Sequence, residues 1–257
     1  MIRSHDRVAI VLTMCLLAPG ASAGDEPLAR RVSGWGEVVD PSRDCKVSHD
    51  PARDRLMISV PATPHVLSAE VVGMPLSAPR VLQGVYGDFK ATVRAVGKLD
   101  PGVSRTTHYD PYHGAGLLVW KNDRNYLRLE RAVGTIRGRA TPYLNYEQRQ
   151  DGRLAFSVGI PIEDHPIHLK VERADGAIRA WRSPDGSKWS ALPDLATSMI
   201  DKVEVGVVAI NSSLRPLRAE LERFRVDTSS GAEAPTESTA KLTSKPAEAA
   251  GDRRESK

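Results

Sequence analysis

Alternation of apolar and polar positions, with a period of two residues, is the main pattern in the middle of the chain. Between residues 114 and 131, two apolar runs flank the polar, turn-forming residues 121–125. Two such runs around a five-residue polar loop predict a β-hairpin. Setting Trp120 opposite Tyr126 fixes the register, because side chains alternate across a strand. One side of the hairpin then carries only Leu117, Val119, Leu127 and Leu129. We therefore expect this side to face a core.

The opposite side of the same hairpin mixes aromatic and charged groups. Trp120 and Tyr126 lie side by side on it, with Arg128 one step along the strand and Glu130 beyond. Aromatic rings pack on the C–H patch of a pyranose and polar groups bind its hydroxyls, so we interpret this face as a carbohydrate site. The alternative is that the two rings pack between sheets as a cross-strand aromatic pair, with Arg128 and Glu130 paired to each other or to facing strands.

Short strand patterns separated by turn signals recur along the rest of the chain. They cover residues 34–41, 55–61, 87–96, 167–173, 178–182 and 203–210. Residues 61–79 contain several prolines and are expected to form a long loop that packs by Val66 and Leu67. Residues 133–153 have little periodicity, so they are also expected to form a loop. Tyr143 and Tyr146 would then lie at the rim of the carbohydrate site, since loops on a rigid scaffold often carry binding residues.

The segment from residue 214 to residue 226 fits two patterns. Its leucines and Phe224 are spaced three, four and three residues apart, which is typical of an amphipathic helix. The same residues also alternate with charged ones, which is typical of a strand with a bulge at Arg223. An isolated helix in a series of hairpins is out of place, so the strand is favoured. The whole pattern predicts an all-β chain: a two-sheet antiparallel jelly-roll sandwich.

The two ends of the chain are not expected to belong to this domain. Arg3 and Arg7 precede an apolar run over residues 8–18, and small residues end at Ala23. This is the pattern of a secretory signal peptide (residues 1–23), with cleavage after Ala23 and export to the periplasm or the outside. Residues 227–257 lack aromatics and are expected to form a disordered tail. One domain over residues 24–226 remains.

Composition narrows the function further. Cys45 is the only cysteine left after cleavage, so no intramolecular disulfide is expected and the core must hold the fold. The chain carries a net charge of +4, but basic and acidic residues are interspersed, which disfavours nucleic-acid binding. Met14 before Cys15 disfavours a lipid anchor, and no later segment is long enough to span a bilayer. We expect a monomer without membrane insertion.

Several of these motifs together resemble a known family. They lie at residues 34–41, 78–83, 87–89, 114–131, 183–186 with Trp189, and 205–211. In this order they resemble the concanavalin A-like jelly-roll domains of the "regulation of enolase" type, and the hairpin is similar to the C-terminal accessory domain of bacterial β-xylosidases. The resemblance implies a two-sheet jelly roll whose concave face or rim loops hold carbohydrate. Fold alone does not give function. Some resembling families bind calcium at a loop, but no matching acidic cluster is present here.

Other chemically capable groupings are weaker. Glycosidases need two carboxyl groups about 5 Å apart, and Glu220 and Glu222 share a face, but flanking arginines make them a solvated charge ladder. Residues 108–113 and 164–168 contain histidines and aspartates without an evident third or fourth ligand. Residues 122–125 offer oxygens for calcium beside Lys121 and Arg124, so a turn is the better explanation. We therefore predict no catalytic residue, no metal and no cofactor.

The sequence as a whole predicts an exported, non-catalytic module that binds a glycan through Trp120, Tyr126, Arg128 and Glu130, with Tyr143 and Tyr146 at the rim. Two alternatives remain open. One is a glycoside hydrolase acting on polysaccharide, and the other is a structural domain that binds another protein.

Overall fold

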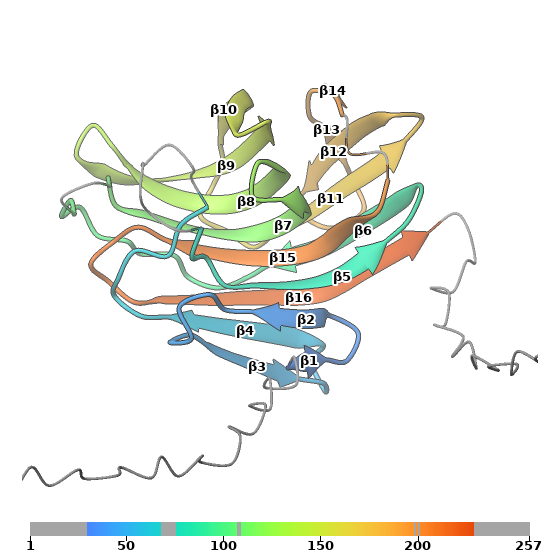
Figure 1. Cartoon of the computed structure of the whole chain (residues 1–257). Coiled ribbons are helices and arrows are strands. Elements are labelled where there is room, and N and C mark those ends of the chain that lie inside the picture. Colours follow the sequence, from blue (N-terminus) through green and yellow to red (C-terminus); the bar gives the residue numbers. More distant parts are fainter. Residues whose placement is uncertain (1–29, 68–75, 107–108, 198, 200, 229–257) are drawn as a thin grey trace, which may run out of the picture.

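The computed structural model describes residues 30–67, 76–106, 109–197, 199 and 201–228, and all regular secondary structure in them is β-strand. Two antiparallel sheets lie against each other in two layers (Figure 1). The predicted all-β, two-sheet antiparallel sandwich is therefore confirmed. The predicted signal peptide and nearly all of the predicted tail lie outside the described residues. Within the described residues, no helix exists that is long and apolar enough to cross a membrane.

The strands of the first sheet, here called sheet A, follow the order β1-β2-β5-β15-β7-β8-β9-β10. They are β1 (Arg31–Val32), β2 (Gly36–Val39), β5 (Arg80–Val85), β15 (Val203–Asn211), β7 (Tyr112–Asn122), β8 (Asn125–Ile136), β9 (Arg139–Gln150) and β10 (Arg153–Pro161). Sheet B follows the order β13-β12-β11-β6-β16-β4-β3, and β14 pairs with β12. Its strands are β13 (Ser190–Ala191), β12 (Ala177–Ser183), β11 (Ile167–Ala174), β6 (Phe89–Ala95), β16 (Leu217–Thr228), β4 (Arg55–Val60), β3 (Lys46–Asp50) and β14 (Leu195–Ala196).

The central hairpin is β7 and β8, and its predicted register is confirmed. Trp120 pairs with Tyr126, and the pairings continue down both strands as expected. The connection is tighter than predicted, because Asn122 pairs with Asn125 and leaves a two-residue turn after a bulge. The apolar side faces the core between the sheets: Leu117, Val119, Leu127 and Leu129 are all fully buried.

The prediction of a loop over residues 133–153 is wrong. β8 continues to Ile136, a two-residue turn follows at Arg137 and Gly138, and β9 begins at Arg139. Both turn residues have positive φ, as tight hairpin turns require. The strand escaped detection because Pro142 and Gln148 occupy inward positions of β9 and Tyr143 occupies an outward one, so the alternation of apolar and polar residues is weak.

The final segment is a strand, as favoured. β16 runs from Leu217 to Thr228, two residues beyond the predicted end of the domain. Its register against β6 shifts between Glu222 and Arg225, and Arg223 has a φ of 56°, in the left-handed region. The predicted bulge at Arg223 is therefore confirmed.

Candidate functional site

The outer face of sheet A, which points away from sheet B, has an apolar half. Leu82, Leu118, Val208 and Ile210 form it on β5, β7 and β15. Leu67 and Ala78, from the segment that joins β4 to β5, pack onto it. Residues 68–75 of that segment lie outside the described residues. An outer sheet face is here partly covered by the chain itself, which creates a second, smaller core.

Trp120 and Tyr126 lie at the border of this covered area. Their rings stack with centroids 5.3 Å apart and planes 21° apart, and the guanidinium of Arg80 lies 4.4 Å from the centroid of the Trp120 ring. The Tyr126 hydroxyl donates a hydrogen bond to the Leu67 carbonyl at 2.6 Å. Trp120 is only 6% exposed and Tyr126 is fully buried. A sugar-binding face as predicted requires the Trp120 ring to face solvent, and this part of the prediction is therefore wrong. The alternative of packing between the sheets is also wrong, because the pair lies outside sheet A.

The other half of the outer face carries what we call the β8–β9 cluster: Arg128, Glu130, Asn145, Glu147 and Arg149. Arg128 pairs with Glu147 across the strands, and Glu130 pairs with Asn145. Glu147 accepts hydrogen bonds from Arg128 Nη2 at 2.6 Å and from Arg149 Nε at 2.9 Å. Both guanidiniums therefore hold one carboxylate, in a part of the sheet where little water reaches.

Glu130 is the most deeply buried member of the cluster, with no exposed surface. Its Oε2 accepts hydrogen bonds from the Tyr112 hydroxyl at 2.6 Å and from Asn145 Nδ2 at 3.1 Å, and Arg128 Nη1 lies 3.7 Å away. Burial raises the pKa of Glu130 although Arg128 opposes the shift. Among the described residues, neither Glu130 Oε1 nor Arg128 Nε has a hydrogen-bond partner. One buried acceptor and one buried donor are thus left over within the same cluster.

Two half-buried tyrosines flank this cluster. The rings of Tyr112 and Tyr143 meet edge to face with centroids 6.3 Å apart. Glycines lie beneath both rings: a Cβ on Gly114 would lie 2.5 Å from the Tyr112 hydroxyl, and one on Gly134 would lie 3.2 Å from Tyr143 Cε1. Gly159, on β10, flanks Tyr143 in the same way. Strand positions without side chains therefore allow the two rings to lie close against the sheet.

Five of the six predicted site residues share this face, namely Trp120, Tyr126, Arg128, Glu130 and Tyr143. Tyr146 does not, because it pairs with Leu129 and therefore points to the opposite side of sheet A. It is fully buried in the main core, edge to face with Phe156 at 5.5 Å, so its predicted place on a rim loop is wrong. The sequence prediction missed Tyr112, Asn145, Glu147 and Arg149. The alternate polar positions of β9 and the strand glycines were the available signals.

The weaker groupings have structural explanations where the structure describes them. His113 is buried and its Nε2 lies 2.9 Å from Ser213 Oγ, while Asp110 pairs with Arg105 at 2.8 Å. His108 lies outside the described residues. Asn122 Oδ1 accepts hydrogen bonds from the backbone of Arg124 and the side chain of Asn125, so it stabilises the β7–β8 turn.

Comparisons with known proteins give information on the fold of this chain and not on its function. No family model and no curated protein matches the chain. Among solved structures, a protein of unknown function from Saccharomyces cerevisiae matches with a TM-score of 0.60 and 16% identity, over 77% of this chain and 98% of that one. At that identity the likeness concerns the β-sandwich fold alone.

Two weaker structural matches come from carbohydrate-active proteins. A xylan β-1,4-xylosidase from Bacillus halodurans matches with a TM-score of 0.48 and 13% identity, over 67% of this chain and 33% of its own. The carbohydrate-binding module CBM66 from Bacillus subtilis matches with a TM-score of 0.46 and 11% identity, over 77% of this chain and 100% of its own. Neither score is high enough to support an argument about this chain.

Proposed function

We propose that this chain is an exported, non-catalytic carbohydrate-binding β-sandwich, and that the glycan binds beside the β8–β9 cluster. The observation that carries the proposal is the leftover acceptor on Glu130 together with the leftover donor on Arg128. A sugar hydroxyl both donates and accepts a hydrogen bond, so it matches such a pair. Export is inferred from residues 1–23, and the more specific resemblance to "regulation of enolase" domains also stays a prediction.

The surroundings of the pair support the same proposal. Tyr112 and Tyr143 are half-buried, and the side chain of Arg128 is 12% exposed, so a ligand would reach the cluster from this side. Aromatic rings next to a few fixed polar groups are the usual composition of a small-molecule site. The ion pairs around Glu147 fix the polar groups in advance, which lowers the ordering cost of binding. In this arrangement Trp120 and Tyr126 are buried beside the cluster and support the site. The contact with sugar is assigned to Tyr112 and Tyr143.

One observation favours the alternative of a glycoside hydrolase. Glu130 has a raised pKa, as a general acid requires, and a second carboxyl group, Glu147, lies on the same face and accepts hydrogen bonds from two arginines. However, both carboxyl groups are at most 7% exposed, and the partners of Glu147 leave it little freedom to act as a nucleophile. We therefore retain binding as the proposal. Release of reducing sugar from neutral polysaccharides, lost in Glu130→Gln, would favour the hydrolase.

A panel of neutral oligosaccharides and polysaccharides tests the proposal. We expect at least one to bind the wild-type chain, and Tyr143→Ala to weaken its affinity about tenfold, the loss of one stacking contact. Tyr86→Ala is the matched control, because Tyr86 is 51% exposed and lies outside the cluster. Melting temperatures of both variants show that they are folded. No binding across the panel, or equal affinities for the two variants, would refute the proposal.

A further inference from the structure

Three potential metal ligands of different chemistry meet at one end of the sandwich. Asp44 and Cys45 lie in the loop between β2 and β3, and His65 lies in the segment after β4. One ligand atom from each of the three residues lies within 4.8 Å of the other two. His65 is 2% exposed, Cys45 is half-buried and Asp44 is exposed, so the group is held by a buried residue on one side and is open to solvent on the other.

The hydrogen bonds of His65 decide which ring nitrogen faces the group. Nδ1 lies 2.8 Å from the Thr63 carbonyl, which only accepts hydrogen bonds, so Nδ1 carries a proton. Nε2 is therefore the nitrogen available to a ligand, and it lies 2.8 Å from Asp44 Oδ1. A backbone carbonyl that fixes the tautomer and orientation in this way is typical of histidines that bind metal ions. The backbone of His65 is held as well, since it exchanges two hydrogen bonds with Asn211 on β15.

The neighbours of Cys45 favour a cation. Asp40 accepts a hydrogen bond from the Cys45 amide at 2.9 Å, and the Cys45 thiol lies 3.6 Å from Asp44 Oδ1. The carboxylates of Asp40 and Asp44 therefore both lie beside Cys45. A divalent cation at this place would supply positive charge next to the two carboxylates and the sulfur.

We propose that Asp44, Cys45 and His65 form a zinc-binding site. A carboxylate oxygen, a thiolate sulfur and an imidazole nitrogen are all zinc ligands, and three protein ligands leave a fourth position for water in a tetrahedral site. Zinc would replace the proton of the thiol and any proton on Nε2. The exposed Asp44 side chain can rotate to open the present 2.8 Å separation to the wider spacing around a metal ion. The site is separate from the proposed glycan site and does not depend on it.

The experiment uses the full chain, reduced and freed of metal with a chelator, titrated with Zn²⁺ by calorimetry and with Co²⁺ by absorption spectroscopy. We expect one Zn²⁺ per chain, a rise in melting temperature, and a thiolate-to-cobalt charge-transfer band. Cys45→Ser should abolish that band and weaken zinc binding at least tenfold. Asp44→Asn should weaken zinc binding to a smaller extent. Both substitutions are close in size to the native residues and lie at exposed or half-buried positions, so the fold is expected to persist.

His165→Ala is the matched control. His165 also lies beside a carboxylate, with Nδ1 3.2 Å from Glu163 Oε2, but it is exposed and has no thiol nearby among the described residues. It should bind zinc as the wild-type chain does. Absence of stoichiometric zinc binding, an unchanged affinity in Cys45→Ser, or loss of binding in the control instead would each overturn the proposal. Glycan binding measured on the same variants separates a failure of this site from a failure of the proposed function.

Discussion

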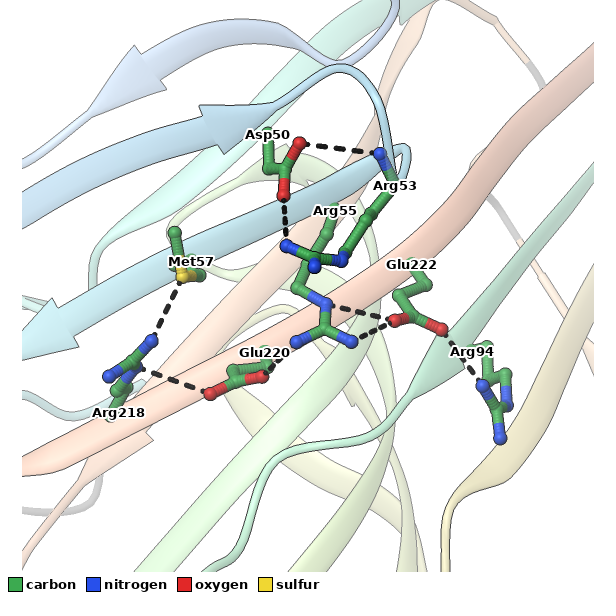
Figure 2. A network of polar contacts seen from close by, with 8 residues as sticks. All are labelled: Asp50, Arg53, Arg55, Met57, Arg94, Arg218, Glu220 and Glu222. Carbon is green, nitrogen blue, oxygen red and sulfur yellow. Dashed lines mark hydrogen bonds and ion pairs between the residues drawn. The ribbon is translucent and has the colours of Figure 1, made fainter.

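Two networks of arginine and glutamate lie on opposite outer faces of the sandwich, and they differ in their exposure to water. The first is the β8–β9 cluster on sheet A. The second, here called the β4–β16 ladder, consists of Arg55, Arg94, Arg218, Glu220 and Glu222 on sheet B (Figure 2). In the ladder, Arg55 bridges Glu220 at 2.8 Å and Glu222 at 2.5 Å. Its arginine side chains are 30% to 66% exposed, whereas Arg128 and Arg149 are 12% and 3% exposed.

The comparison shows that the same residue types have different energetic roles on the two faces. Exposed ion pairs contribute little to stability, because water and salt screen them. Buried pairs are costly to desolvate, and removing one partner leaves an uncompensated charge. The sequence predicted a solvated charge ladder, and the arginines of the ladder are open to solvent as expected. The ladder lies across β16, an interior strand between β6 and β4. The ladder is therefore explained as a set of largely solvent-exposed ion pairs, and the β8–β9 cluster is the arrangement that needs a further explanation such as a ligand.

The largest expected difference between the faces concerns their tryptophans. Trp120→Ala should cost about 3–5 kcal/mol of unfolding free energy, because it empties a packed site beneath Leu67 and Arg80. Trp181, on the outer face of sheet B, is half-buried, and the Lys170 ammonium lies 4.1 Å from the centroid of its ring. Its replacement by alanine should cost about 1 kcal/mol of unfolding free energy. Urea denaturation of both variants measures the two values. Equal losses would show that the outer faces are buried alike, contrary to the comparison.

A second difference concerns the charges themselves. Glu147→Ala should cost about 3 kcal/mol, because it leaves both Arg128 and Arg149 without their shared carboxylate in a buried place. Glu220→Ala is the matched change in the ladder, where the carboxylate is 20% exposed, and should cost less than about 1 kcal/mol. A higher salt concentration should reduce the loss of unfolding free energy in Glu220→Ala and leave the loss in Glu147→Ala unchanged. A loss for Glu220→Ala as large as that for Glu147→Ala would break the distinction.

The sequence predicted those features that local patterns determine. The β7–β8 register followed from the polar turn and the alternation on both sides of it, and the strand with a bulge at Arg223 followed from alternating charge. What the sequence did not predict depends on contacts between distant segments. Trp120 is covered because Leu67 and Ala78, from the segment between β4 and β5, pack over the outer face of sheet A, and no pattern around Trp120 signals this.

The same reason explains the missed site residues. The polar side chains of β9 resemble a loop until they are placed opposite β8, where Asn145 meets Glu130 and Glu147 meets Arg128. Asp44 and His65 are separated by 20 intervening residues in the sequence, and only the turn back through β3 and β4 brings them together. Spacing rules for metal sites describe ligands on one loop or helix, so they do not detect such a pair.

The smallest expected effect is a difference of sign in the pH dependence of stability. Burial raises the pKa of Glu130, so the folded chain holds this proton above the ordinary glutamate value of 4.5, and stability falls as pH rises from there through the folded pKa. For Glu222, burial also raises the pKa, but hydrogen bonds from Arg55 and Arg94 outweigh it and the net shift is downward. Its contribution is present above 4.5 and is lost as pH falls through the folded pKa. The experiment measures unfolding free energies of Glu130→Gln and Glu222→Gln by urea denaturation at several pH values on both sides of the ordinary glutamate pKa.

Relative to the wild-type chain, Glu130→Gln should gain stability as pH rises above that value, whereas the destabilisation by Glu222→Gln should vanish toward acid. Parallel curves for the two variants would show that the two carboxyl groups have similar surroundings, and that the unusual chemistry assigned to the β8–β9 cluster is absent.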